Sequence, residues 1–123
     1  DEMLRSIDIL SLNCPATGAT RNLIDERRLG LLKPDAYIIN TARGDIVDQD
    51  ALIEALERGA IAGAGLDVYV GEPQVDPRLL ELGNVTLLPH MGSATIETRT
   101  AMGDKVIANI AAWARGETPP DPC

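Results

Sequence analysis

The chain has 123 residues, a formal net charge of −8 at pH 7 and a pI near 4.5. This length fits one domain with one core, and the acidic balance argues against a general nucleic-acid-binding or acidic-membrane surface. An anion site would have to be local, made by a single arginine or a helix N-terminus. Apolar residues make up 45% of the chain, with no Phe, one Trp and two Tyr, so we expect an aliphatic core.

Cysteine and histidine usage argues against a metal site. Cys14 and Cys123 show no metal-ligand spacing, and the chain has one histidine. Free cysteines are typical of the reducing cytoplasm, where we expect this protein to act. No apolar run is long enough to span a bilayer, so we expect no membrane partner. Residues 1–6 are typical of the end of a helix, and we expect the chain to be an excerpt of a longer one.

The first half of the chain predicts two strands and two helices. Ile7–Leu12 alternates in polarity and predicts a strand, followed by a loop of small residues, Asn13–Thr20. Asp25 can cap a short helix through about Leu32. The apolar run Tyr37–Ile39 predicts a second strand, and Asp48 caps the next helix. That helix has an apolar stripe and a natural terminator at Gly59; the stripe consists of Ala51, Leu52, Ala55 and Leu56.

The second half continues the alternation. Ile61–Val68 predicts a strand whose internal glycines, Gly63 and Gly65, suggest a close neighbour to the backbone. Asp76-Pro77 begins a short helix, and Val85–Leu88 is the last predicted strand. A long helix runs from about Ala94 to Arg115 and stops at Gly116. The remaining residues, 117–123, have no core pattern and form a tail.

Strands that alternate with helices indicate an α/β fold with a parallel sheet of four strands and flanking helices. In a parallel sheet the carboxyl ends of all strands lie at one edge, where ligands bind in open α/β folds. The loops gathered there are Asn13–Thr20, Thr41–Ile46, Val68–Val75 and Pro89–Ser93.

Three functional side chains fall in these loops: Arg43, Glu72 and the single histidine, His90. Arginine offers a planar fork that binds a carboxylate bidentately. A carboxylate beside His90 favours the imidazolium form, which can act as a general acid toward a carbonyl oxygen. Taken singly, each is better explained as a solvated surface residue. Their convergence on one edge makes the functional and the solvated interpretations about equally good.

The glycines Gly63 and Gly65 do not form a dinucleotide fingerprint. The third glycine is absent, because position 68 is Val68, and the pair lies inside a strand instead of a strand-to-helix turn. The sequence therefore predicts no phosphate-cradling glycine loop of its own.

The motifs, in their order and spacing, resemble those of the D-isomer-specific 2-hydroxyacid dehydrogenases, and most of all the glyoxylate/hydroxypyruvate reductases among them. The resemblance covers nearly the whole chain. Its motifs are Cys14-Pro15 with Thr17 and Thr20, Asn40-Thr41-Ala42-Arg43-Gly44, Gly63-Ala64-Gly65-Leu66-Asp67-Val68, Glu72-Pro73, and Pro89-His90-Met91-Gly92-Ser93-Ala94-Thr95.

This resemblance implies a role for each site residue. Arg43 binds the substrate carboxylate, His90 is the acid/base, and Glu72 orients His90. The substrate is a small 2-keto acid, glyoxylate or hydroxypyruvate, and the cofactor is NAD or NADP. Related formate dehydrogenases carry Gln where this chain has Glu72, which argues for hydroxyacid chemistry. The cofactor-binding residues implied are Cys14, Pro15 and Thr20 on the adenosine side, Thr41, Ala42 and Arg43 near the nicotinamide, Asp67 at its carboxamide, and His90, Gly92 and Ser93.

The resemblance also implies a domain organisation. Residues 1–116 correspond to the C-terminal half of a doubly wound Rossmann domain, with residues 117–123 as a tail. The half with the glycine fingerprint and the substrate domain are not in this sequence, so we expect the isolated chain to be inactive and to form a homodimer. The alternative is a folded, self-associating half-Rossmann or flavodoxin-like module without catalysis. A receiver domain is excluded, because Asn13-Cys14-Pro15 follows the first strand in place of an acidic cluster.

Overall fold

A computed structural model describes residues 1–122; Cys123, the second cysteine and the end of the predicted tail, lies outside the described residues. The chain forms two compact units, Asp1–His90 and Met91–Cys123. The first unit holds the sheet and the second holds one long helix.

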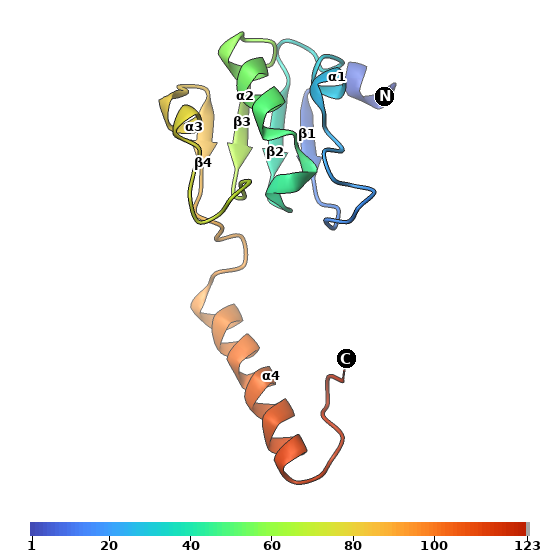
Figure 1. Ribbon diagram of the computed structural model, residues 1–123, viewed down its shortest axis with the longest axis vertical. Coiled ribbons are helices and arrows are strands. Elements are labelled where there is room, and N and C mark those ends of the chain that lie inside the picture. Colours follow the sequence, from blue (N-terminus) through green and yellow to red (C-terminus); the bar gives the residue numbers. More distant parts are fainter. Residues whose placement is uncertain (123) are drawn as a thin grey trace. The chain divides into compact units, whose positions relative to one another are not determined.

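The first unit is built on one four-stranded parallel sheet (Figure 1). Its strands are β1 (Ile9–Leu12), β2 (Tyr37–Asn40), β3 (Gly63–Leu66) and β4 (Val85–Leu87), in the order β1-β2-β3-β4. Every neighbouring pair is parallel, with Ile9 beside Tyr37 and Tyr37 beside Gly63 in register. The predicted α/β fold with a parallel four-stranded sheet is confirmed.

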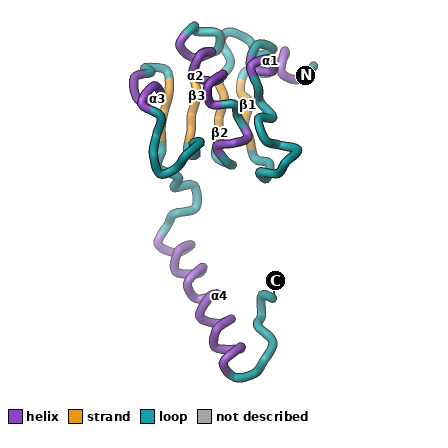
Figure 2. The backbone as a smooth tube through the Cα atoms, in the orientation of Figure 1, coloured by secondary structure: helices purple, strands orange, loops and turns teal. Residues whose placement is uncertain are grey.

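Three helices cover one face of this sheet (Figures 1 and 2). They are α1 (Glu26–Leu29), α2 (Gln49–Glu57) and α3 (Pro77–Glu81), and two short 3-10 turns, η1 (Met3–Arg5) and η2 (Gly44–Ile46), accompany them. Each helix begins at the predicted aspartate, whose carboxylate accepts a hydrogen bond from a backbone N–H of the first turn; these caps are Asp25, Asp48 and Asp76.

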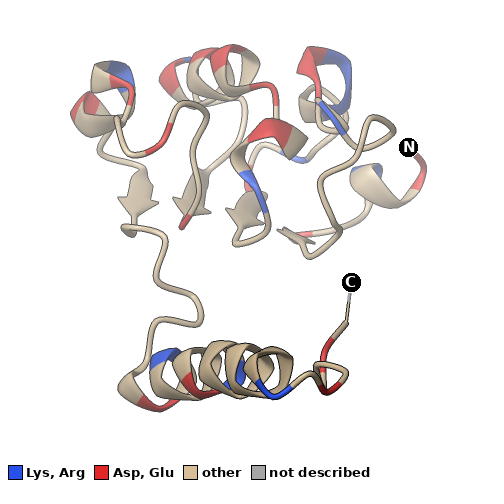
Figure 3. Ribbon diagram, turned by 60° about the horizontal axis from the view of Figure 1, so that its bottom comes forward, with Lys and Arg blue, Asp and Glu red and all other residues tan. Residues whose placement is uncertain are grey.

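The core lies between this face of the sheet and the helices, and it is aliphatic as expected. Ile38 of β2 and Ile53 of α2 are fully buried, and Leu52 and Leu56 pack beside them. The strands carry no charged residue, while acidic and basic side chains lie on the helices and loops (Figure 3). The buried stripe of α2 differs slightly from the prediction, because Ile53 is buried while Ala51 is only half-buried.

Several element boundaries differ from the prediction; the predicted strand Ile61–Val68, for example, is observed only as Gly63–Leu66. Helix α1 ends at Leu29 instead of Leu32, because the chain tightens there into turns in which Leu31 and Leu32 donate to the carbonyls three residues earlier. Strand β1 begins at Ile9 instead of Ile7. Gly59 follows α2 with a φ of +63°, as expected of a glycine terminator.

The glycines of β3 fit the expected close packing in two ways. A Cβ on Gly63 would lie 2.6 Å from the carbonyl oxygen of Asn84, so the backbone of the neighbouring segment requires glycine there. At Gly65 the nearest atom is a side-chain methyl of Ile39, 3.0 Å away, so that position is tight against a side chain.

The sheet face opposite the helices carries exposed apolar side chains. Ile9 is 62% exposed and its register partner Tyr37 is 50% exposed. Their strand neighbours Leu10 and Ile38 point to the helical face and are buried, as the alternation of a strand requires. Since β1 is the first strand in the sheet order, this face ends at an edge strand.

The second unit consists of α4 (Ile96–Ala114), capped by Thr95, and a tail that folds back along it. Gly116 reverses the chain with a φ of +74°. Asp121 then binds both Lys105 and Asn109, with 2.7 Å between Lys105 Nζ and Asp121 Oδ1. Six large apolar side chains of α4 are exposed: Ile96, Met102, Val106, Ile107, Ile110 and Trp113. Within residues 1–122, no helix combines the length and hydrophobicity that a membrane crossing needs.

Candidate functional site

The carboxyl ends of the four strands point the same way, so the loops that follow them gather at one edge of the sheet (Figure 1). The loop after β2 carries Arg43, and the loop after β3 carries Glu72. The segment after β4 carries His90, the last residue of the first unit. The three residues that were predicted to converge therefore all belong to one compact unit.

Glu72 and His90 are in direct contact. The imidazole Nδ1 lies 2.6 Å from Glu72 Oε2, and the other carboxylate oxygen accepts a hydrogen bond of 2.8 Å from the Tyr69 backbone N–H. The hydrogen bond with His90, followed by that from Tyr69, holds the pKa of the Glu72 carboxyl below its usual range. The positive charge of Arg43 acts in the same direction. Glu72 is therefore an ionised acceptor that faces the imidazole of His90.

The backbone at His90 adopts a conformation that side chains rarely take. Its φ is +51°, in the left-handed region, where a residue with a Cβ is strained. The imidazole remains half-exposed, with 47% of its side-chain surface accessible. The ring of His90 is thus in contact with Glu72 and also accessible to a ligand.

A cavity of about 550 Å³ opens beside this pair. Glu72 and His90 line it together with side chains that are mostly apolar: Tyr69, Pro73, Val75, Leu80, Leu87, Leu88 and Pro89.

Arg43 is presented by a loop that the side chain of Asn40 organises. Asn40 is buried; its amide group donates to the Arg43 carbonyl at 2.9 Å, and its oxygen accepts from the Ala42 N–H at 3.1 Å. The Arg43 guanidinium is exposed and donates to the Ala42 carbonyl, and within residues 1–122 it makes no ion pair. Its remaining N–H groups suit an anionic ligand.

A second cavity, of about 580 Å³, lies between the loops after β1 and β2. Five of the residues assigned to the cofactor on the basis of the sequence line it: Cys14, Pro15, Thr41, Ala42 and Arg43. The structure thus brings these five together. Thr20 closes the same loop, because its hydroxyl donates to the Pro15 carbonyl at 2.7 Å.

The other assigned residues have separate positions. Asp67 is 3% exposed at the end of β3, and its backbone N–H donates to the Asn40 carbonyl. Gly92 and Ser93 belong to the second unit, and their part in the site stays a prediction.

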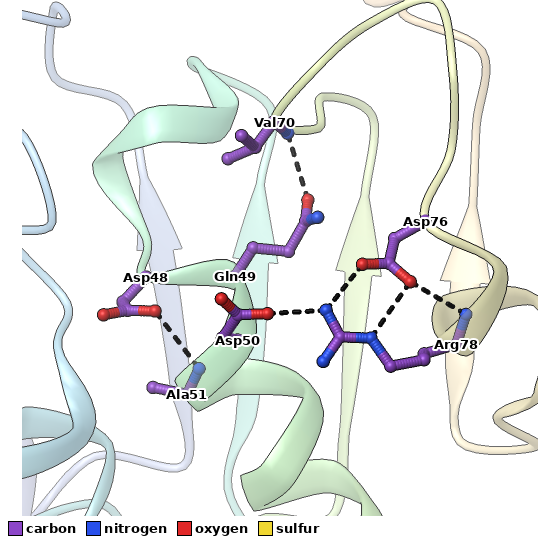
Figure 4. A network of polar contacts seen from close by, with 7 residues as sticks. All are labelled: Asp48, Gln49, Asp50, Ala51, Val70, Asp76 and Arg78. Carbon is purple, nitrogen blue, oxygen red and sulfur yellow. Dashed lines mark hydrogen bonds and ion pairs between the residues drawn. The ribbon is translucent and has the colours of Figure 1, made fainter.

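The loop that carries Glu72 is fastened on both sides of it (Figure 4). On one side, the Val70 N–H donates to the side-chain oxygen of Gln49, the first residue of α2, at 3.0 Å. On the other, Arg78 forms ion pairs with both Asp76 and Asp50, at 2.7 and 2.5 Å. These contacts tie the loop to α2 and restrict where Glu72 can lie.

Two residues of the site, Asn40 and Tyr69, received no individual role from the sequence. Asn40 carries a detectable signal, because asparagine at the end of a buried strand often folds the following loop through its side chain. Tyr69 carries none, since its contacts depend on the distance between two strands. Within residues 1–122, no cluster of histidine, cysteine and carboxylate side chains could hold a metal ion.

The chain is similar to proteins of one known family. Residues 1–92 match the family described as "D-isomer specific 2-hydroxyacid dehydrogenase, NAD binding domain". Glyoxylate reductases are similar to this chain over nearly its whole length. The enzyme of Thermococcus litoralis is 49% identical over 121 residues, and that of Pyrococcus furiosus is 50% identical over 120 residues. The matches cover 98% of this chain and 37% and 36% of those proteins, so the chain spans little more than a third of their length.

Solved structures show the same likeness. The NADPH-dependent glyoxylate/hydroxypyruvate reductase of Sinorhizobium meliloti, in complex with NADP and malonate, is 45% identical with a TM-score of 0.86, over 91% of this chain and 35% of that one. The holo form of Rhodotorula graminis D-mandelate dehydrogenase is 40% identical with a TM-score of 0.87, and the match covers 99% of this chain and 36% of that one.

Proposed function

The chain belongs to the family of D-isomer-specific 2-hydroxyacid dehydrogenases, as part of its NAD-binding domain, and on this premise we propose that it serves the reversible reduction of a small 2-keto acid to a 2-hydroxy acid. Glyoxylate and hydroxypyruvate are the proposed substrates. The observation that carries the proposal is the contact of Glu72 with His90, beside a loop that presents the unpaired Arg43.

The geometry supports a specific division of labour. Glu72 holds Nδ1 of His90, which leaves Nε2 as the atom that gives a proton to the carbonyl oxygen of the substrate. Arg43 binds the substrate carboxylate through its planar fork and places the carbonyl near His90. In the reverse direction His90 removes the proton from the hydroxyl group. Glu72 stabilises the imidazolium form in either direction.

The residues of this chain suit one part of a nicotinamide cofactor, NAD or NADP, but provide no binding site for its pyrophosphate. The cavity lined by Cys14, Pro15, Thr41 and Ala42 is large, and small residues form its wall. When bound, the cofactor supplies or accepts the hydride at the substrate carbon. No glycine-rich turn for its pyrophosphate occurs in the sequence. We therefore propose that residues 1–116 form the C-terminal half of the cofactor domain, and that the chain alone is inactive.

The chain also has features suited to self-association, and we propose a homodimer. Strand β1 is an edge strand and carries the exposed Ile9, while α4 presents exposed apolar side chains. A folded module that associates but does not catalyse is the second candidate, and the same two observations favour it.

A chimera tests the catalytic proposal. In the Thermococcus litoralis glyoxylate reductase, the matched residues are replaced by this chain, and reduction of glyoxylate by NADH and NADPH is followed. We expect activity that depends on His90. A folded chimera that binds cofactor but reduces no keto acid would contradict the catalytic proposal and favour the silent module.

A further inference from the structure

Tyr69 lies where the ends of β3 and β4 meet. The side chain is 8% exposed, and its phenol hydroxyl donates to the Leu88 carbonyl at 2.5 Å. The Leu66 carbonyl, at the end of β3, lies 3.1 Å from the same hydroxyl. A phenol has a single donor hydrogen, so the hydroxyl shares it between two strand ends. Leu88 comes two residues before His90, and the hydroxyl thus anchors the segment that presents the imidazole.

The backbone of the same residue holds the carboxylate. The Tyr69 N–H donates to Glu72 Oε1 at 2.8 Å, while Glu72 Oε2 faces His90 at 2.6 Å. Tyr69 therefore acts on both members of the pair: through its amide on Glu72 and through its phenol on the segment of His90.

The loop that carries Arg43 packs against Tyr69 as well. A Cβ on Gly44 would lie 2.2 Å from the carbonyl carbon of Tyr69 and 2.3 Å from its oxygen. Real Cβ atoms do not approach a backbone so closely, so glycine at position 44 is what lets the two loops touch. Three loops with three assigned side chains thus meet at one residue.

We propose that Tyr69 is a positioning residue, which sets the spacing of Arg43, Glu72 and His90 by joining the loops that carry them. The importance of this spacing for catalysis rests on the proposed function. The claim that Tyr69 connects the three loops does not depend on that function. The competing explanation is that Tyr69 only fills the core, in which case phenylalanine would serve equally well.

The decisive comparison is Tyr69→Phe with Tyr37→Phe in the full chain. Tyr37, the other tyrosine, is 50% exposed, and its hydroxyl makes no hydrogen bond within residues 1–122. The measurement is the NMR titration of the Glu72 carboxyl carbon, with the single imidazole of His90 as a second signal. We expect Tyr69→Phe to raise the pKa of Glu72 toward its ordinary range, because the imidazole moves away. Tyr37→Phe should leave both signals unchanged.

An unchanged Glu72 titration in Tyr69→Phe would overturn the proposal. If that variant fails to fold, the wild-type chain supplies the test: the hydroxyl proton of Tyr69 should exchange slowly with water and that of Tyr37 rapidly. Fast exchange at both would likewise contradict the proposal.

A kinetic experiment separates this proposal from the function on which it rests. In the active chimera, Tyr69→Phe should lower kcat by about 10- to 100-fold, the cost of a small misplacement of catalytic groups. Tyr37→Phe should have no effect. If His90→Ala leaves the chimera fully active, the proposed function fails, and the NMR result still decides whether Tyr69 joins the loops.

Discussion

Nδ1 of His90 lies 2.6 Å from Oε2 of Glu72, although 18 residues separate the two along the chain. The contact follows from the parallel pairing of β3 with β4, because each residue lies just beyond the carboxyl end of its strand. Both ends are fixed: Glu72 by the Tyr69 amide and His90 by a backbone that keeps φ at +51°. Such a pair suits the proton transfer that we propose for His90.

His90→Ala in the chimera should lower turnover by about 10²–10⁴-fold, the usual cost of losing one acid/base group. The Michaelis constant for glyoxylate should change less, since Arg43 is expected to provide the carboxylate contact. Steady-state kinetics in parallel with circular dichroism would check both points. Near-wild-type turnover would remove His90 from the role of proton donor.

Arg43→Lys in the chimera should raise the Michaelis constant for glyoxylate, because a point charge does not replace a bidentate fork. Arg58→Lys is a matched control, since Arg58 follows α2 and is exposed away from the strand ends. The measurement is the Michaelis constant of each variant beside that of the unmodified chimera. Equal constants for Arg43→Lys and the unmodified protein would contradict carboxylate binding by Arg43.

The sequence predicted the sheet and the helix starts well, because both depend on local signals. Aspartate caps mark where three helices begin, at Asp25, Asp48 and Asp76, and short apolar runs indicate where the strands lie, though not where they start. For Glu72 and His90, the sequence predicted that both lie at the same edge of a parallel sheet. It did not predict that their side chains are in direct contact. The role of Tyr69 could not be anticipated at all, since it depends on the separation of Leu66 and Leu88 in space.

Glu72 should make the stability of the chain depend on acidic pH. Its pKa is lowered in the folded state, chiefly by His90 and then by the Tyr69 amide. Its contribution is therefore present above the ordinary glutamate pKa of about 4.3 and is lost as the pH falls through the lower folded value. The difference in unfolding free energy between wild type and Glu72→Gln, about 1 kcal/mol or less, should shrink on acidification.

Urea unfolding of the chain at pH 7 and at progressively lower pH measures this difference. Glu54→Gln is the control, because Glu54 is exposed in α2. A gap between wild type and Glu72→Gln that stays constant down to the lowest pH would show that Glu72 has no favourable contact in the folded chain.

The isolated chain should not reduce keto acids. Its sequence has no glycine-rich turn at a helix N-terminus for the pyrophosphate, and the side chain of His90 is exposed to water. Keto-acid reduction by the purified chain is measured beside the active chimera, with titration of reduced nicotinamide fluorescence to record binding. His90-dependent turnover by the chain alone would contradict this prediction.

The isolated chain should self-associate, because β1 is an apolar edge strand. It pairs with β2 on one side only, and its exposed Ile9 lies on the sheet face that α1, α2 and α3 leave uncovered. Natural edge strands are usually blunted by lysine, proline or a bulge, and β1 contains none of these. Two copies meeting across a two-fold axis at this edge would pair the free backbone groups of both strands.

Light scattering at several concentrations measures the mass of the chain, and we expect that of a dimer. Ile9→Lys should weaken the dimer, because it places a charge on the edge strand and removes apolar surface. Glu54→Lys is the stringent control: it changes the net charge more than Ile9→Lys does, but at an exposed position of α2. Equal weakening by both would indicate a general charge effect, and a monomer mass at every concentration would show that the edge strand does not drive association.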